Sequence, residues 1–86
     1  MSKAPALLAA GLYQHYKGRY YQVTDTVRHS ETDEVLVLYR ALYGDFGLWV
    51  RPLAMFTEQV PTDTGTKPRF AFVSADIPSA LRQPSR

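Results

Sequence analysis

The chain has 86 residues, of which 45% are hydrophobic and 13% aromatic, which is enough for one compact core and too little for two. It has no cysteine, which excludes a disulfide-stapled secreted mini-protein and agrees with a cytoplasmic location. The net charge is +2, yet the segment from Gly11 to Val60 carries five basic and six acidic residues. Nucleic-acid binders cluster Lys and Arg on the folded surface, so a protein or small-molecule ligand is favoured over nucleic acid.

The two ends of the chain differ from its aromatic middle. Residues 1–10 are expected to be a flexible leader, because the apolar run Ala6–Ala10 is too short for a signal peptide or a membrane span. Residues 74–86 contain two prolines and few apolar side chains, which is typical of a flexible polar tail or a short terminal turn. A single domain over residues 11–73 is therefore predicted, with no membrane association.

The domain opens with the pattern of a β-hairpin. Residues that favour strands stand on both sides of a Lys17-Gly18 turn, and the second strand continues to Arg28. Alternation along that strand predicts an inward face, although one acidic member is out of place and indicates a bulge or an edge. This face comprises Tyr21, Val23, Asp25 and Val27.

Residues 29–44 allow two interpretations. A helix over residues 31–43 is favoured by acidic residues at its start and by a helical spacing of apolar residues that ends at Gly44. A strand is favoured by the continuous apolar run Val35–Tyr39, in which β-branched residues alternate with others. We expect the strand, which makes His29–Glu34 a polar hairpin loop.

The second half of the domain predicts more short elements. Residues 43–47 form a turn with two glycines that can adopt positive φ, and residues 48–51 form a strand ended by Pro52. One helical turn is expected from Pro52 to Phe56, followed by a hairpin that pairs residues 57–60 with 68–73. Five or six short antiparallel strands in so small a chain favour a mainly β fold, a small SH3-like barrel, with an α+β fold as the alternative.

A series of ordered motifs lies between Gly11 and Phe72. The motifs are Gly11-Leu12-Tyr13, His15-Tyr16-Lys17-Gly18, Arg28-His29-Ser30-Glu31-Thr32, Tyr39-Arg40-Ala41-Leu42-Tyr43-Gly44-Asp45, Trp49-Val50-Arg51-Pro52, Met55-Phe56 and Pro68-Arg69-Phe70. Together they resemble a known bacterial family, domain of unknown function 1653. The resemblance implies no activity, substrate or catalytic residue, because the family has none established.

Trp49 and Arg51 are the first candidates for a ligand site. They share a face of the predicted strand, and Tyr39 or Tyr43 from the neighbouring strand would join them. Such a group offers aromatic and guanidinium surface for a peptide, nucleotide or carboxylate. The simpler interpretation, favoured at this point, is that Trp49 fills the core while Arg51 lies over it.

The remaining candidates have weaker chemistry. Neighbouring strand residues point to opposite faces, so His29 is not placed to activate Ser30 as a hydrolase nucleophile. Glu31 and Glu34 lie in a loop without glycine, so a solvated acidic loop is favoured over a metal site. Arg40 is expected in a surface ion pair with Asp45 or Glu34. No metal or cofactor is predicted.

These patterns favour a non-catalytic binding or protein-interaction module. An enzyme or metal-binding domain that uses the His29–Glu34 loop is one alternative. A structural homo-oligomer is the other, because Tyr13, Tyr16, Tyr20 and Tyr21 cannot all point inward from alternating strands.

Overall fold

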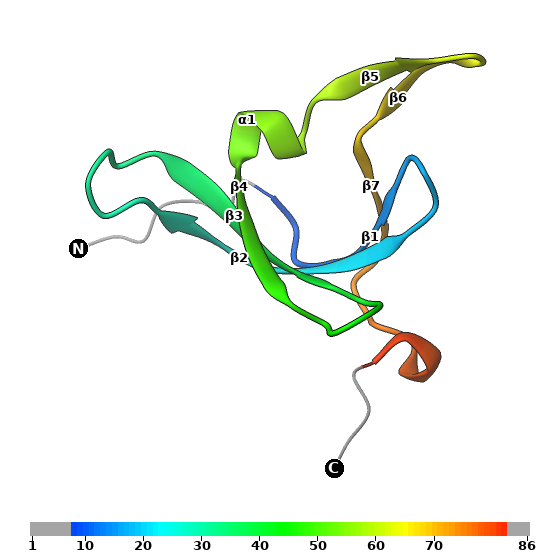
Figure 1. Ribbon diagram of the computed structural model, residues 1–86, viewed down its shortest axis with the longest axis horizontal. Helices are drawn as coiled ribbons and strands as arrows, with labels where there is room; N and C mark the ends of the chain where they lie inside the picture. The colour runs from blue at the N-terminus through cyan, green and yellow to red at the C-terminus, as the bar shows by residue number, and fades with distance from the viewer. Residues whose placement is uncertain (1–7, 83–86) are drawn as a thin grey trace.

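The computed structural model describes residues 8–82, and in them the chain is mainly β, as predicted (Figure 1). The strands are β1 (Gly11–His15), β2 (Tyr20–Arg28), β3 (Val35–Ala41), β4 (Leu48–Pro52), β5 (Gln59–Thr62), β6 (Gly65–Pro68) and β7 (Phe70–Ser74). One helical turn, α1 (Leu53–Phe56), follows β4, and a 3-10 turn, η1 (Ser79–Leu81), follows β7. Among the described residues, no helix is both long and apolar enough to cross a bilayer.

Residues 35–41 form a strand, so the helical alternative for residues 31–43 is wrong. β3 pairs antiparallel with β2 on one side and with β4 on the other. The apolar run therefore lies in the sheet with a neighbour on each edge, which is where β-branched residues pack best. The loop His29–Glu34 closes the β2–β3 hairpin, with the His29 amide donating to the Glu34 carbonyl at 2.8 Å.

The strands form two sheets with seven strands in place of the five or six expected. The larger sheet has the order β4-β3-β2-β1-β7, and β5 pairs with β6 as a separate hairpin that projects from it (Figure 1). Within residues 8–82 no pairing joins β4 to β7, so the larger sheet is open and the closed barrel is not observed. The predicted hairpin is present only at its loop end, where Gln59 pairs with Pro68 and the Arg69 amide donates to the Glu58 carbonyl. From Phe70 onward the prediction is wrong, because Phe70–Ser74 pairs with β1.

A β-bulge at residues 23–25 explains the misplaced Asp25. The β2–β3 register shifts between Val23 and Asp25, as the acidic residue indicated. The extra residue reverses the alternation, because a shift of one residue moves each later side chain to the other face. Thr26 therefore shares the face of Val23, and the prediction that Asp25 and Val27 face inward with it is wrong.

The core lies on one face of the larger sheet, beneath α1. Six buried residues form it, and Leu8, Tyr21 and Leu53 pack against them in part. The six are Tyr13, Val23, Val37, Tyr39, Phe56 and Phe70. The rings of Phe56 and Phe70 stack at 4.1 Å, so the helical turn is held to the sheet by aromatic packing.

The core extends beyond Gly11 toward the start of the chain. The Tyr13 hydroxyl donates to the Ala9 carbonyl at 2.6 Å, and Leu8 packs against the core. These two contacts hold residues 8 and 9 against β1. Residues 1–7 of the predicted leader and 83–86 of the predicted tail lie outside the described residues.

Candidate functional site

The β3–β4 register places Trp49 and Arg51 on the face that carries the core. Tyr39 lies opposite Trp49, and Val37 lies opposite Arg51. Opposed residues of an antiparallel pair project to the same face, and both Val37 and Tyr39 are buried core residues. The predicted face-sharing of Tyr39, Trp49 and Arg51 is therefore present.

Around Arg51 the sheet gathers three tyrosines, two arginines and a histidine, which we term the tyrosine–arginine cluster. Its members come from the four strands β1, β2, β3 and β4 and from the β1–β2 and β3–β4 turns. They are His15, Arg19, Tyr21, Tyr39, Tyr43 and Arg51. Phe70 lies at its centre, with ring centroids 4.9 Å from His15, 5.3 Å from Tyr21 and 5.8 Å from Tyr39.

Two contacts organise the tyrosine hydroxyls of the cluster. The hydroxyls of Tyr21 and Tyr43 form a hydrogen bond at 2.6 Å, and Arg51 Nε donates to the Tyr39 hydroxyl at 3.5 Å. Burial, together with the hydrogen bond to Tyr43, raises the pKa of Tyr21. The Tyr21 hydroxyl therefore keeps its proton at neutral pH and remains a hydrogen-bond donor.

The arginines of the cluster lack carboxylate partners in the described chain. The Arg19 guanidinium lies 4.4 Å from the centre of the Tyr43 ring, and that of Arg51 lies 5.8 Å from the Phe70 ring. The ion pairs within residues 8–82 are elsewhere, between Arg28 and Asp33 and between Arg69 and Glu58. The two guanidinium groups thus lie against aromatic rings, and no carboxylate among the described residues neutralises their charge.

His15 lies at the edge of the cluster, where several cations surround it. Burial and the positive charges of Arg69, Lys17 and Arg51 lower the pKa of His15 below its ordinary value of 6.5. Both causes disfavour the imidazolium form. The ring is therefore neutral at pH 7 and carries one donor and one acceptor nitrogen.

This depressed pKa predicts acid sensitivity. Because unfolded His15 binds a proton more readily than folded His15, its contribution to stability is complete above pH 6.5 and is lost as pH falls through the folded-state pKa. In urea unfolding between about pH 7 and pH 5, the H15Q variant should lose less stability than the parent. Identical slopes for the two proteins would contradict this prediction.

Trp49 does not fill the core, so the interpretation favoured from the sequence is wrong. Its side chain is 59% exposed, and its neighbours Leu48 and Val50 are each 53% exposed. The reason is its position on β4, which is an edge strand that pairs, within the part of the chain described, with β3 on one side. Phe56, from the helical turn after β4, fills the space over the core and is 1% exposed.

Arg40 and Asp45 act inside the β3–β4 turn, and the expected ion pair between them is not observed. Arg40 Nη1 donates to the Phe46 carbonyl at 2.6 Å, and Asp45 Oδ1 accepts from the Gly47 amide at 3.1 Å. Positive φ falls on Gly44 at 61° and on Phe46 at 57°, so only one of the two glycines adopts it. Both polar side chains therefore stabilise a tight turn.

The His29–Glu34 loop is a hairpin turn at a distance from the cluster. His29 Nδ1 accepts from the amide of Glu31 at 3.1 Å, and the Thr32 side chain accepts from the Glu34 amide at 3.2 Å. The described residues contain no group of three or more His, Cys, Asp or Glu side chains arranged to hold a metal ion. The chemistry of this loop is that of polar side chains bonding to backbone.

Sequence reasoning missed three cluster members: His15, Arg19 and Tyr21. The signal for Tyr21 was available, since the alternation of β2 assigned it to the inward face. Its pairing with Ala41 and proximity to Tyr43 depend on the β2–β3 register. Arg19 lies in a turn, and its approach to Tyr43 depends on the same β2–β3 register, which continues where the Leu42 amide donates to the Tyr20 carbonyl at 3.1 Å.

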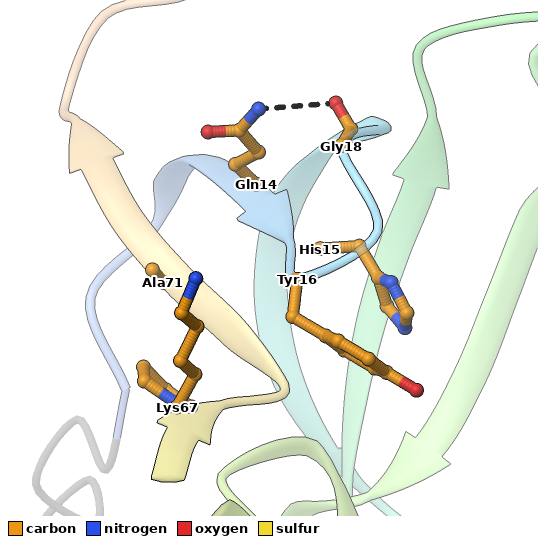
Figure 2. A pocket seen from close by; sticks show the side chains of 7 residues that line it. Gln14, His15, Tyr16, Gly18, Lys67 and Ala71 are labelled. Atoms are coloured by element: carbon orange, nitrogen blue, oxygen red, sulfur yellow. Dashed lines mark hydrogen bonds between the residues drawn. The ribbon is translucent and has the colours of Figure 1, made fainter. Parts of the chain in front are cut away.

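A shallow pocket of about 250 Å³ adjoins the cluster at His15. It is lined by Gln14, His15, Tyr16, Gly18, Lys67, Pro68 and Ala71. Figure 2 shows the Gln14 amide bonded to the Gly18 carbonyl, at 3.1 Å, while the rings of His15 and Tyr16 point away from Lys67. Because the Gln14 amide is already bonded to the Gly18 carbonyl, the pocket offers fewer free polar groups than the cluster.

Comparisons with known proteins agree with the resemblance stated from the motifs. The model of the family DUF1653, described as a protein of unknown function, matches residues 11–72. A crystal structure of a DUF1653 protein from Bordetella bronchiseptica is 40% identical, with a TM-score of 0.76, over 85% of this chain and 96% of that chain. No protein with a curated function matches the sequence.

Proposed function

This chain belongs to the DUF1653 family, and we propose that it is a binding module whose tyrosine–arginine cluster receives a small carboxylate-bearing ligand. The observation that carries the proposal is the pair of arginines, Arg19 and Arg51, that have aromatic neighbours and no carboxylate partner within residues 8–82. A carboxylate accepts hydrogen bonds from guanidinium and hydroxyl donors together.

Electrostatics support an anion at this position. The positive charges of Arg69, Lys17 and Arg51 all act on His15, and among these three only Arg69 has a carboxylate neighbour within residues 8–82. A bound carboxylate would offset the mutual repulsion of these three cations. The Tyr21 and Tyr39 hydroxyls lie on the same face and add neutral donors, and protonated Tyr21 does not repel an anion.

The aromatic surroundings favour a ligand with a planar apolar body. The half-buried rings of Tyr21 and Tyr43 meet edge-to-face with centroids 5.5 Å apart, and Trp49 is exposed on the same face of the sheet. Such rings contact a flat apolar group well, while the arginines orient its charged end. Benzoate is the simplest probe that combines both parts.

The test is an NMR titration with benzoate and with its neutral isostere benzamide. We expect benzoate to shift signals of Tyr21, Tyr39 and the Arg51 side chain, and benzamide to bind more weakly. Replacing Arg51 by alanine should weaken benzoate binding at least about tenfold, because a hydrogen bond to a charged group contributes about 1.5–3 kcal/mol.

Arg28→Ala is the matched control, because Arg28 is an arginine in the distant hairpin, paired with Asp33. This variant should bind benzoate like the parent. Equal affinity for benzamide would contradict the proposed charge recognition. Shifts confined to the pocket around Lys67 would assign the ligand to that pocket and contradict the proposed site.

A further inference from the structure

Strand β4 leaves one of its edges unpaired in the described chain. It is the first strand in the order β4-β3-β2-β1-β7, and its only strand partner there is β3. Leu48, Trp49 and Val50 are between 53% and 59% exposed. Natural edge strands are commonly protected by lysine or proline, but β4 has no lysine and its proline stands at the last position.

The hydrogen bonds of the turn reveal which backbone groups of β4 point outward. Gly47 accepts from the Ala41 amide at 3.0 Å, so the carbonyl of Gly47 faces β3, and the register beyond it pairs Tyr39 with Trp49 and Val37 with Arg51. In an antiparallel ladder, alternate residues direct both N–H and C=O to the same side. Trp49 and Arg51 therefore also bond toward β3, while Leu48, Val50 and Pro52 present theirs to the free edge.

These outward groups are self-complementary about Val50. In a second copy placed antiparallel around a two-fold axis at Val50, each Val50 amide meets the other Val50 carbonyl. Two residues away, each Leu48 amide meets the carbonyl of the other copy's Pro52. Pro52 has no N–H to donate in return, but it is the last residue of β4, so the missing hydrogen bond falls at the end of the ladder between the two copies.

The same register also matches the side chains. It places Trp49 of each copy opposite Arg51 of the other, as a non-hydrogen-bonded pair, in which side chains approach most closely. A guanidinium over an indole is the best of the cation–π pairs. On the opposite face, Val50 meets Val50, next to the half-buried Leu36 and Leu38 that flank β4 in the sheet.

We propose that β4 pairs with β4 of a second copy of this chain, joining two five-stranded sheets and placing Trp49 of one copy over Arg51 of the other. The partner's tryptophan would then become part of the tyrosine–arginine cluster. We assign the free edge of β4 to a second copy because one two-fold register satisfies three features at once. These are the outward-facing amides, the position of Pro52 and the pairing of Trp49 with Arg51.

The test is sedimentation at increasing protein concentration, without added ligand, combined with fluorescence of Trp49, the single tryptophan. The mass should rise from monomer to dimer, and the emission should shift to the blue in parallel as the indole becomes covered. In the V50K variant two lysines face each other across the axis, and the dissociation constant should rise at least about tenfold.

Two further variants make the result specific to the register. V50P removes the central amide donor, which β3 does not use, and should also give a monomer. Mixing V50K with V50E should restore a dimer, because opposite charges then face each other at the axis. Val73→Lys is the matched control, since Val73 is 47% exposed on β7, and it should dimerise like the parent.

A parent protein that stays monomeric at every concentration would overturn the proposal. So would a dimer that survives both V50K and V50P, because its interface would lie elsewhere. The outcome does not depend on ligand binding: Val50 projects from the face opposite the cluster, so the V50K monomer should still respond to benzoate if the proposed function holds.

Discussion

Replacing Phe56 by alanine is expected to lower the free energy of unfolding by about 3–5 kcal/mol, which is a large share of the stability of a small domain. Phe56 is 1% exposed and stacks on Phe70 at 4.1 Å. Its ring also lies 5.6 Å from that of Tyr13 and 5.4 Å from that of Tyr39. The substitution removes the contact that holds α1 on the sheet and leaves a cavity between them.

Urea unfolding followed by circular dichroism measures this effect. Met55→Ala is the matched control, because Met55 precedes Phe56 in the same helical turn and is 48% exposed. The control should change stability by less than about 0.5 kcal/mol, as is usual for surface positions. A loss below about 1 kcal/mol for Phe56→Ala would show that the aromatic stack contributes little, contrary to the fold described.

Replacing Gly11 by alanine is expected to be the other severe change. Gly11 has φ of 138°, a region that residues with a side chain rarely adopt. An added Cβ would collide with the Ser74 carbonyl oxygen and approach Ala75 Cα to 3.0 Å. Both obstacles are backbone at the end of β7, so the β1–β7 pairing must shift, at a cost of more than about 3 kcal/mol.

Gly18→Ala separates the collision from the backbone strain. Gly18 has φ of 111°, and an added Cβ there would have nothing within 4 Å. This variant should therefore show the strain alone, about 1–3 kcal/mol. Equal losses of stability for the two alanine variants, measured by urea unfolding, would contradict the predicted collision at Ser74.

Local patterns in the sequence were sufficient to predict most of the strands. The Lys17-Gly18 turn, the apolar run from Val35 and the position of Pro52 depend on neighbouring residues alone, through turn geometry, strand preference and the missing amide of proline. The bulge was also indicated locally, because an acidic residue, Asp25, interrupts the apolar alternation of its own strand. Hairpin pairings are also local, since short turns leave adjacent strands little freedom of partner.

Pairing between distant strands was beyond these patterns. The choice of β1 as the partner of β7 joins residues more than fifty positions apart, and nothing near Phe70 in the sequence distinguishes β1 from β5. That choice puts Phe70 beside His15 and Tyr21. The β1–β7 pairing therefore decides which residues lie around the predicted Tyr39 and Arg51. For this reason the sequence predicted only part of the cluster.

The sequence by itself determined that this protein is a mainly β domain with an aromatic face carrying Tyr39, Trp49 and Arg51. Only the tertiary structure decided that the sheet is open, that Trp49 is on an exposed edge, and that Phe56 takes its place over the core. The physical reason is that alternation along a strand specifies which side chains share a face. Which strands lie beside it, and what covers it, depend on contacts between residues far apart in the chain.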